Sequence, residues 1–87
     1  MKVKTIQFKC DESLHMKSIA ILIKKASVFE SRIWLTQGSR KANAKSLLGV
    51  MSLGIEDGAT IEVSAEGSDE AEAVDTIAAY LSNPTVE

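Results

Sequence analysis

The chain has 87 residues, 45% of them hydrophobic, a length that favours one hydrophobic core and a single domain spanning residues 1–87. Its apolar runs are short and broken by lysines, so we expect a cytoplasmic protein with no signal peptide and no membrane insertion. Cys10 is the only cysteine, which excludes an internal disulfide and predicts a small strand residue rather than a redox centre.

Charge is divided unevenly along the chain. Residues 1–50 carry all ten Lys and Arg against three acids, whereas residues 51–87 carry nine acids and no base. This division can mark a basic docking face for an acidic partner or for phosphate, but charge alone favours two halves that are solvated and pair with each other. The basic residues are scattered and the pI is about 5.4, so we expect no direct binding of nucleic acid.

The first half of the chain predicts a strand, a helix and a hairpin. Polar and apolar residues alternate over 5–10, which is typical of a half-buried strand. Apolar residues then recur at helical spacing from Ile19 to Phe29, which predicts an amphipathic helix. Alternation over 32–36 and 41–43, on either side of the sequence QGSR, predicts a hairpin with a glycine turn.

The second half predicts a short helix, a strand and a final helix. Ser46 is a good N-cap and Gly54 a plausible stop for the short helix. Asp69, with a glutamate three residues later, has the pattern of a capping box at the start of the final helix. The strand is predicted to point Ile61, Val63 and Ala65 inward and Thr60, Glu62, Ser64 and Glu66 outward. The buried stripe of the final helix is predicted as Ala71, Val74, Ala78 and Leu81, before a frayed tail.

The resulting order is β-α-β-β-α-β-α. Strands with one wet face predict an α/β (α+β) open-faced sandwich, in which a four-stranded antiparallel sheet is covered on one face by three helices. This architecture hosts many unrelated activities, so the function has to be argued from particular residues.

Several kinds of site are excluded by what the sequence lacks. One histidine and one cysteine are too few for a zinc or non-haem iron centre, so we expect no metal. Neither GxxxxGK[ST] nor GxGxxG occurs, so no nucleotide cofactor is expected. No serine has the sequence context of a hydrolase nucleophile. We therefore expect no cofactor of any kind.

His15 is the first candidate for chemistry. It lies just ahead of the apolar stripe, near the N-cap of the first predicted helix. Free N–H groups and the positive end of the helix dipole favour a neutral, nucleophilic imidazole there and can hold a phosphoryl group, and Lys17 adds a cation. The same position also suits an ordinary surface or capping histidine.

Ser46 is the second candidate. A phosphate on its hydroxyl would lie where a helix begins and need not disturb the fold, although the position by itself favours an ordinary N-cap. Leu47, Leu48 and Met51 follow it, and a helix of two turns cannot bury every apolar residue. These side chains therefore either belong to the core or form an adaptable docking patch beside Ser46.

The segment NAKSLLGVMSLGIEDGATIEVSAEGSDEAEA, residues 43–73, closely resembles the HPr family, the histidine-containing phosphocarriers of the bacterial sugar phosphotransferase system. The motif KSLLGVMSLG is similar to the form in low-GC Gram-positive bacteria. There, HPr kinase/phosphorylase phosphorylates the serine with ATP, and the product binds a catabolite-control transcription regulator. The resemblance implies that Ser46 is a regulatory phosphorylation site and that Leu47, Leu48 and Met51 dock partners.

The family's second motif is an L-H-A-R-P-A type sequence, and here residues 14–19 read L-H-M-K-S-I. The resemblance implies that His15 accepts a phosphoryl group from enzyme I and passes it to the IIA domains of sugar permeases, with Lys17 and Ser18 contacting the phosphate. Lysine keeps the charge of arginine without its planar fork, and serine lacks the fixed φ of proline.

A second interpretation within the family stays open, because Crh-like paralogues lack the histidine and act only through the regulatory serine. His15 favours a carrier, whereas Lys17 and Ser18 favour a mainly regulatory protein. The chain is expected to be either a monomer or a dimer that exchanges its first strand.

Overall fold

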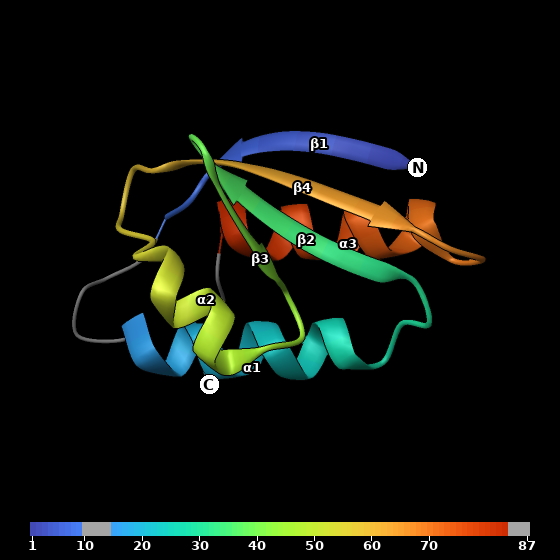
Figure 1. The fold of residues 1–87 in the computed structure, drawn as a ribbon, viewed down its shortest axis with the longest axis horizontal. Helices are drawn as coiled ribbons and strands as arrows, with labels where there is room; N and C mark the ends of the chain where they lie inside the picture. The colour runs from blue at the N-terminus through green and yellow to red at the C-terminus, as the bar shows by residue number, and fades with distance from the viewer. Residues whose placement is uncertain (10–14, 84–87) are drawn as a thin grey trace.

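The computed structural model describes residues 1–9 and 15–83, except for the side chain of His15; Cys10 therefore lies outside the described residues. The elements follow the predicted order β-α-β-β-α-β-α (Figure 1). Their bounds are β1 Lys2–Gln7, α1 His15–Ser27, β2 Arg32–Gln37, β3 Arg40–Asn43, α2 Leu47–Leu53, β4 Thr60–Glu66 and α3 Glu70–Ser82.

The four strands form one antiparallel sheet in the order β1-β4-β2-β3. Val63 in β4 is opposite Leu35 in β2, and Leu35 is opposite Ala42 in β3, so these buried residues form one row across the sheet. Figure 1 shows α3 running behind the sheet, with α1 and α2 completing the helical layer. The predicted open-faced sandwich is confirmed.

The core lies between the sheet and the helices. Helix α1 and strand β4 contribute residues that their periodicity predicts: Leu22 and Ala26 of α1 are buried, and Ile61 of β4 is fully enclosed. Phe8 lies beyond the end of β1, yet its backbone still pairs with the segment before β4, accepting from Gly58 N at 2.7 Å and donating to Ala59 O at 2.8 Å. This pairing holds the Phe8 ring in the core, where it is buried.

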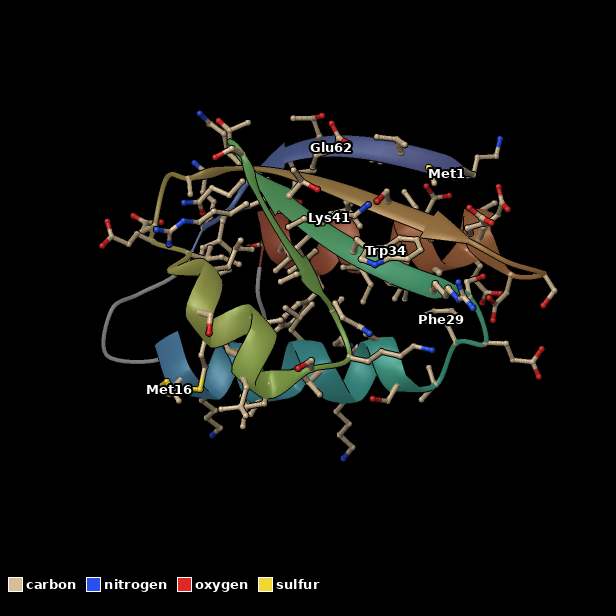
Figure 2. All side chains as sticks on the ribbon, viewed as in Figure 1. Met1, Met16, Phe29, Trp34, Lys41 and Glu62 are labelled. Atoms are coloured by element: carbon tan, nitrogen blue, oxygen red, sulfur yellow. The ribbon has the colours of Figure 1, made fainter. Side chains whose placement is uncertain are left out.

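One residue on the open face of the sheet differs from its prediction. The sequence predicts a solvent-exposed Ser64. The residue is buried, because Val3 on β1 and Trp34 on β2 lie opposite it in the sheet register. Trp34 is itself covered by Lys41, whose Nζ lies 4.7 Å from the ring centroid, as Figure 2 illustrates. A large ring and a long side chain therefore shield the centre of this face from water.

The predicted capping box at the start of α3 is wrong. The Asp69 carboxylate makes no capping hydrogen bond; it accepts from the backbone N–H groups of Glu30 and Ser31, each at 2.9 Å, and from the Ser31 hydroxyl. The backbone N–H groups of Glu30 and Ser31 need a hydrogen-bond acceptor, and the Asp69 carboxylate, which is distant in the sequence, provides it. The predicted burial of Ala71 is also wrong, because the inward stripe contains Ala73 instead and leaves Ala71 in solvent.

The Asp69 contact makes stability depend on pH. The Ser31 hydroxyl, followed by the Glu30 amide, lowers the pKa of Asp69 below its ordinary value of 3.8. A carboxyl with a lowered folded pKa stabilises the fold above its unfolded pKa, and this contribution is lost as pH falls through the folded pKa. We expect Asp69→Asn to reduce the loss of unfolding free energy on acidification from pH 5 to pH 2, measured by urea titration.

The control for this prediction is Asp75→Asn, which changes an exposed aspartate of α3 that pairs with Lys4 Nζ at 3.2 Å on the surface. It is expected to keep a steeper acid dependence than Asp69→Asn. Equal slopes for Asp69→Asn and the unsubstituted chain would contradict the prediction.

Candidate functional site

Helix α1 begins at His15, which confirms the predicted position of this residue at a helix start. The N–H groups of the first turn have no acceptor within the helix and point toward its beginning. Lys17 lies in this turn with an exposed side chain. The side chain of His15 is outside the described residues, so its role stays a prediction.

Ser18 also belongs to the first turn but faces the interior. It is 1% exposed, and its carbonyl accepts a hydrogen bond of 2.9 Å from the Tyr80 hydroxyl on α3. A phosphoryl group arriving from solvent can reach the exposed Lys17 side chain directly, whereas the Ser18 side chain is buried. The burial therefore favours Lys17 over Ser18 as a phosphate contact.

Ser46 is the N-cap of α2, as predicted. Its backbone is extended (φ −108°, ψ 114°) and its Oγ accepts from the Gly49 N–H at 3.1 Å. At the other end of α2, Gly54 adopts the left-handed conformation (φ 68°), and its N–H donates to the Met51 carbonyl. These two caps fit a helix of seven residues between the hairpin and β4.

The apolar residues that follow Ser46 divide between core and surface. Val50 and Leu53 are buried, whereas Leu47, Leu48 and Met51 are 45%, 77% and 43% exposed. A helix this short turns one face to the sheet and leaves the other outside. The three predicted docking residues are therefore accessible to a partner.

Met16 is a further exposed apolar residue, on α1, which packs against α2, and it was not singled out from the sequence. Its side chain is 54% exposed, and Figure 2 shows it at the beginning of α1, on the side of the molecule where α2 lies. The sequence signal that could have identified it is a methionine that follows His15 and does not belong to the predicted apolar stripe of the first helix. We call Met16, Leu47, Leu48 and Met51 the Leu–Met patch.

The turn before Ser46 is fixed to the far end of α1. Lys45 donates from Nζ to the Phe29 carbonyl at 2.6 Å, and its backbone N–H donates to Asn43 Oδ1 at 2.8 Å. A cation at the carbonyls following a helix also complements the helix dipole. Together these bonds set the beginning of α2 against α1.

The described part of the chain contains neither a metal-binding cluster nor a membrane-spanning helix. Within residues 1–9 and 15–83, no His, Cys, Asp and Glu side chains gather in a group of three or more that could hold a metal ion. None of the helices there is long and apolar enough to cross a membrane.

The fold, the histidine at the start of α1 and the serine that caps α2 together define a small HPr-like sandwich. The chain belongs to the HPr family: residues 2–83 match the PTS-HPr family, described as "PTS HPr component phosphorylation site". This membership confirms the family that the sequence resembles.

Similar proteins include both HPr and Crh proteins. The HPr-like protein Crh of Halalkalibacterium halodurans is 36% identical over 81 residues, covering 93% of this chain and 96% of the relative. The crystal structure of HPr-C-His from Thermoanaerobacter tengcongensis has a TM-score of 0.88 at 41% identity, covering 93% of this chain and 91% of that one. Bacillus subtilis Crh, described as a swapped, intertwined dimer, has a TM-score of 0.75 at 29% identity, with coverage of 94% and 90%.

Proposed function

We propose that this protein is a phosphocarrier that accepts a phosphoryl group on His15 from phosphorylated enzyme I and passes it to the IIA domains of sugar permeases. The observation that carries the proposal is the position of His15 at the start of α1 within the residues that match the HPr family. A cytoplasmic location follows from these partners and is part of the proposal.

The proposed chemistry is a transfer between two imidazoles. A ring nitrogen of neutral His15 attacks the phosphorus, forming a new N–P bond as the N–P bond to enzyme I breaks. The exposed Lys17 ammonium and the positive end of the α1 dipole stabilise negative charge on the phosphoryl oxygens during transfer. The IIA domain then takes the group in the same way, which regenerates neutral His15.

The Leu–Met patch is the proposed docking surface for these partners. Exposed methionine and leucine side chains adapt to differently shaped partners and bury apolar area at the contact. Because the patch lies on α2 and at the first residues of α1, a partner docked on it also covers the turn that begins at His15.

Leu48→Ser tests this docking role, because Leu48 is 77% exposed and its removal leaves the core intact. We expect the KM for the protein as a substrate of enzyme I to rise about tenfold. The free energy of unfolding should change by less than about 0.5 kcal/mol. Val28→Ser is the matched control, since Val28 is 75% exposed and outside the patch. An equal rise in KM for both variants would refute a specific docking role.

We further propose that HPr kinase/phosphorylase phosphorylates Ser46. The added charge would lie beside exposed Leu47 and Leu48, where it weakens the encounter with an acidic enzyme I. The half-buried hydroxyl already faces the Gly49 N–H, so phosphoryl oxygens can accept the hydrogen bond that Oγ accepts now.

A second function is favoured by the similarity to Crh and by the altered motif at Lys17 and Ser18. In this alternative the protein is mainly regulatory, and phosphorylated Ser46 binds a catabolite-control transcription regulator. His15 then contributes weak transfer or none.

The two functions are separated by offering the protein two phosphoryl donors. Enzyme I with phosphoenolpyruvate and Mg²⁺ should give an acid-labile phosphate, whereas HPr kinase with ATP should give an acid-stable one. If the first donor leaves no acid-labile phosphate, the carrier function is rejected. If the second leaves Ser46 unmodified, the regulatory function is rejected.

A further inference from the structure

A buried hydrogen bond joins α3 to the first turn of α1. The Tyr80 hydroxyl donates to the Ser18 carbonyl at 2.9 Å, although the two residues are 62 positions apart in the sequence. Tyr80 is 7% exposed and Ser18 is 1% exposed, so both ends of the bond are shielded from water. Lys25 makes a cation–π contact with the same side chain, with its Nζ 5.4 Å from the centroid of the Tyr80 ring.

The hydrogen bond from Tyr80 acts on the first turn of α1, because the Ser18 carbonyl that accepts it lies there. Ser18 is the fourth residue of α1, so its carbonyl belongs to the turn that begins at His15. By helix geometry this carbonyl also accepts from the N–H of Leu22, and the Tyr80 hydroxyl occupies its second lone pair. The end of a helix frays more readily than its middle, and a contact from a neighbouring helix opposes that fraying.

The residue at position 18 increases the need for such a contact. Serine has a free φ and a side chain that can compete with backbone hydrogen bonding, so it does not by itself favour an ordered first turn. The hydrogen bond from Tyr80 on α3 adds a restraint on this turn from a distant part of the sequence.

We propose that Tyr80 is a positioning residue for phosphoryl transfer at His15. Its hydroxyl holds the Ser18 carbonyl and so keeps the first turn of α1 in the orientation that presents His15 and Lys17 to the incoming phosphoryl group. This inference rests on the proposed carrier function and extends it to a residue on another helix. Transfer depends on sub-ångström alignment, so a loosened turn lowers the rate of the chemical step.

Tyr80→Phe tests the proposal, because it removes one oxygen and keeps the ring in the core. With the full chain as substrate of enzyme I, we expect kcat to fall about tenfold, the effect of losing about one buried hydrogen bond from alignment. The KM should stay within about twofold, because the Leu–Met patch is unchanged. Ser82→Ala is the matched control: it removes a hydroxyl of α3 that donates to the Ala79 carbonyl, and it should leave both constants unchanged.

Amide hydrogen exchange supplies a readout that general destabilisation would not reproduce. In Tyr80→Phe, protection should fall about tenfold at residues 19–22, whose N–H groups bond to the first turn, and much less at residues 24–27 of the same helix. Equal losses at both ends would indicate a purely structural role and overturn the proposal.

The transfer assay separates failure of this inference from failure of the carrier function. If the unsubstituted chain accepts phosphate from enzyme I but Tyr80→Phe has the same kcat, the positioning role is rejected and the carrier function stands. If the unsubstituted chain accepts no acid-labile phosphate, the carrier function and the transfer role of Tyr80 are rejected together.

Discussion

Replacing His15 with alanine is expected to abolish acid-labile phosphorylation by enzyme I, a loss of at least about 10³-fold in rate. The reason is chemical: the imidazole nitrogen is the nucleophile that forms the N–P bond, and His15 is the only histidine in the chain. The measurement is incorporation of phosphate from phosphoenolpyruvate, read before and after mild acid. An acid-labile phosphate retained by His15→Ala would contradict the assignment.

The control for this prediction uses the second donor. His15→Ala should still accept an acid-stable phosphate from HPr kinase and ATP, because Ser46 and its contact with Gly49 lie on a different helix. Ser46→Ala should show the reverse pattern, with transfer from enzyme I retained and kinase labelling lost. Two variants with opposite losses exclude misfolding as the cause of either loss.

The elements could be predicted because their signals are local. Alternation in the strands, the apolar stripe of α1 and the caps of α2 at Ser46 and Gly54 all involve residues a few positions apart. The structure confirms the element order and both α2 caps. The candidate residues His15 and Ser46 were located by the same local reasoning, as residues at helix starts.

The missed features depend on contacts between distant segments. Asp69 has the sequence pattern of a capping box, but the turn at Ser31, 38 positions earlier, competes successfully for its carboxylate. Ser64 occupies a position that the alternation of β4 predicts to be solvent-exposed, but its neighbours across the sheet cover it. The burial of Ser18, whose carbonyl accepts from the Tyr80 hydroxyl, is of the same kind, since no local pattern indicates that α3 contacts the first turn there.

Gly67→Ala is the substitution expected to reduce stability most. Gly67 joins β4 to α3 with φ 153°, a value that L residues rarely adopt. An added Cβ would lie 2.6 Å from Ser31 Oγ and 2.7 Å from Ser31 Cα, so a backbone atom would have to move. We expect a loss of about 3 kcal/mol in the free energy of unfolding, measured by urea titration at pH 7.

Gly58→Ala separates the clash from the backbone strain. Gly58 also has a positive φ, 88°, but a Cβ there would meet nothing within 4 Å. Its cost should be about 1 kcal/mol, from strain alone. Equal losses for the two variants would show that the contact with Ser31 adds nothing.

Because of where Gly67 lies, Gly67→Ala also serves as a stability control in the transfer assay. Ser31 is held by the Asp69 carboxylate, so the clash with an added Cβ at Gly67 cannot be relieved by rotating the Ser31 side chain alone. Figure 1 shows the β4–α3 connection and the start of α1 at opposite ends of the molecule. Gly67→Ala should therefore lower stability while its folded fraction retains the kcat for transfer from enzyme I. Tyr80→Phe should lower kcat with a smaller effect on stability, so the pair distinguishes loss of fold from loss of alignment at His15.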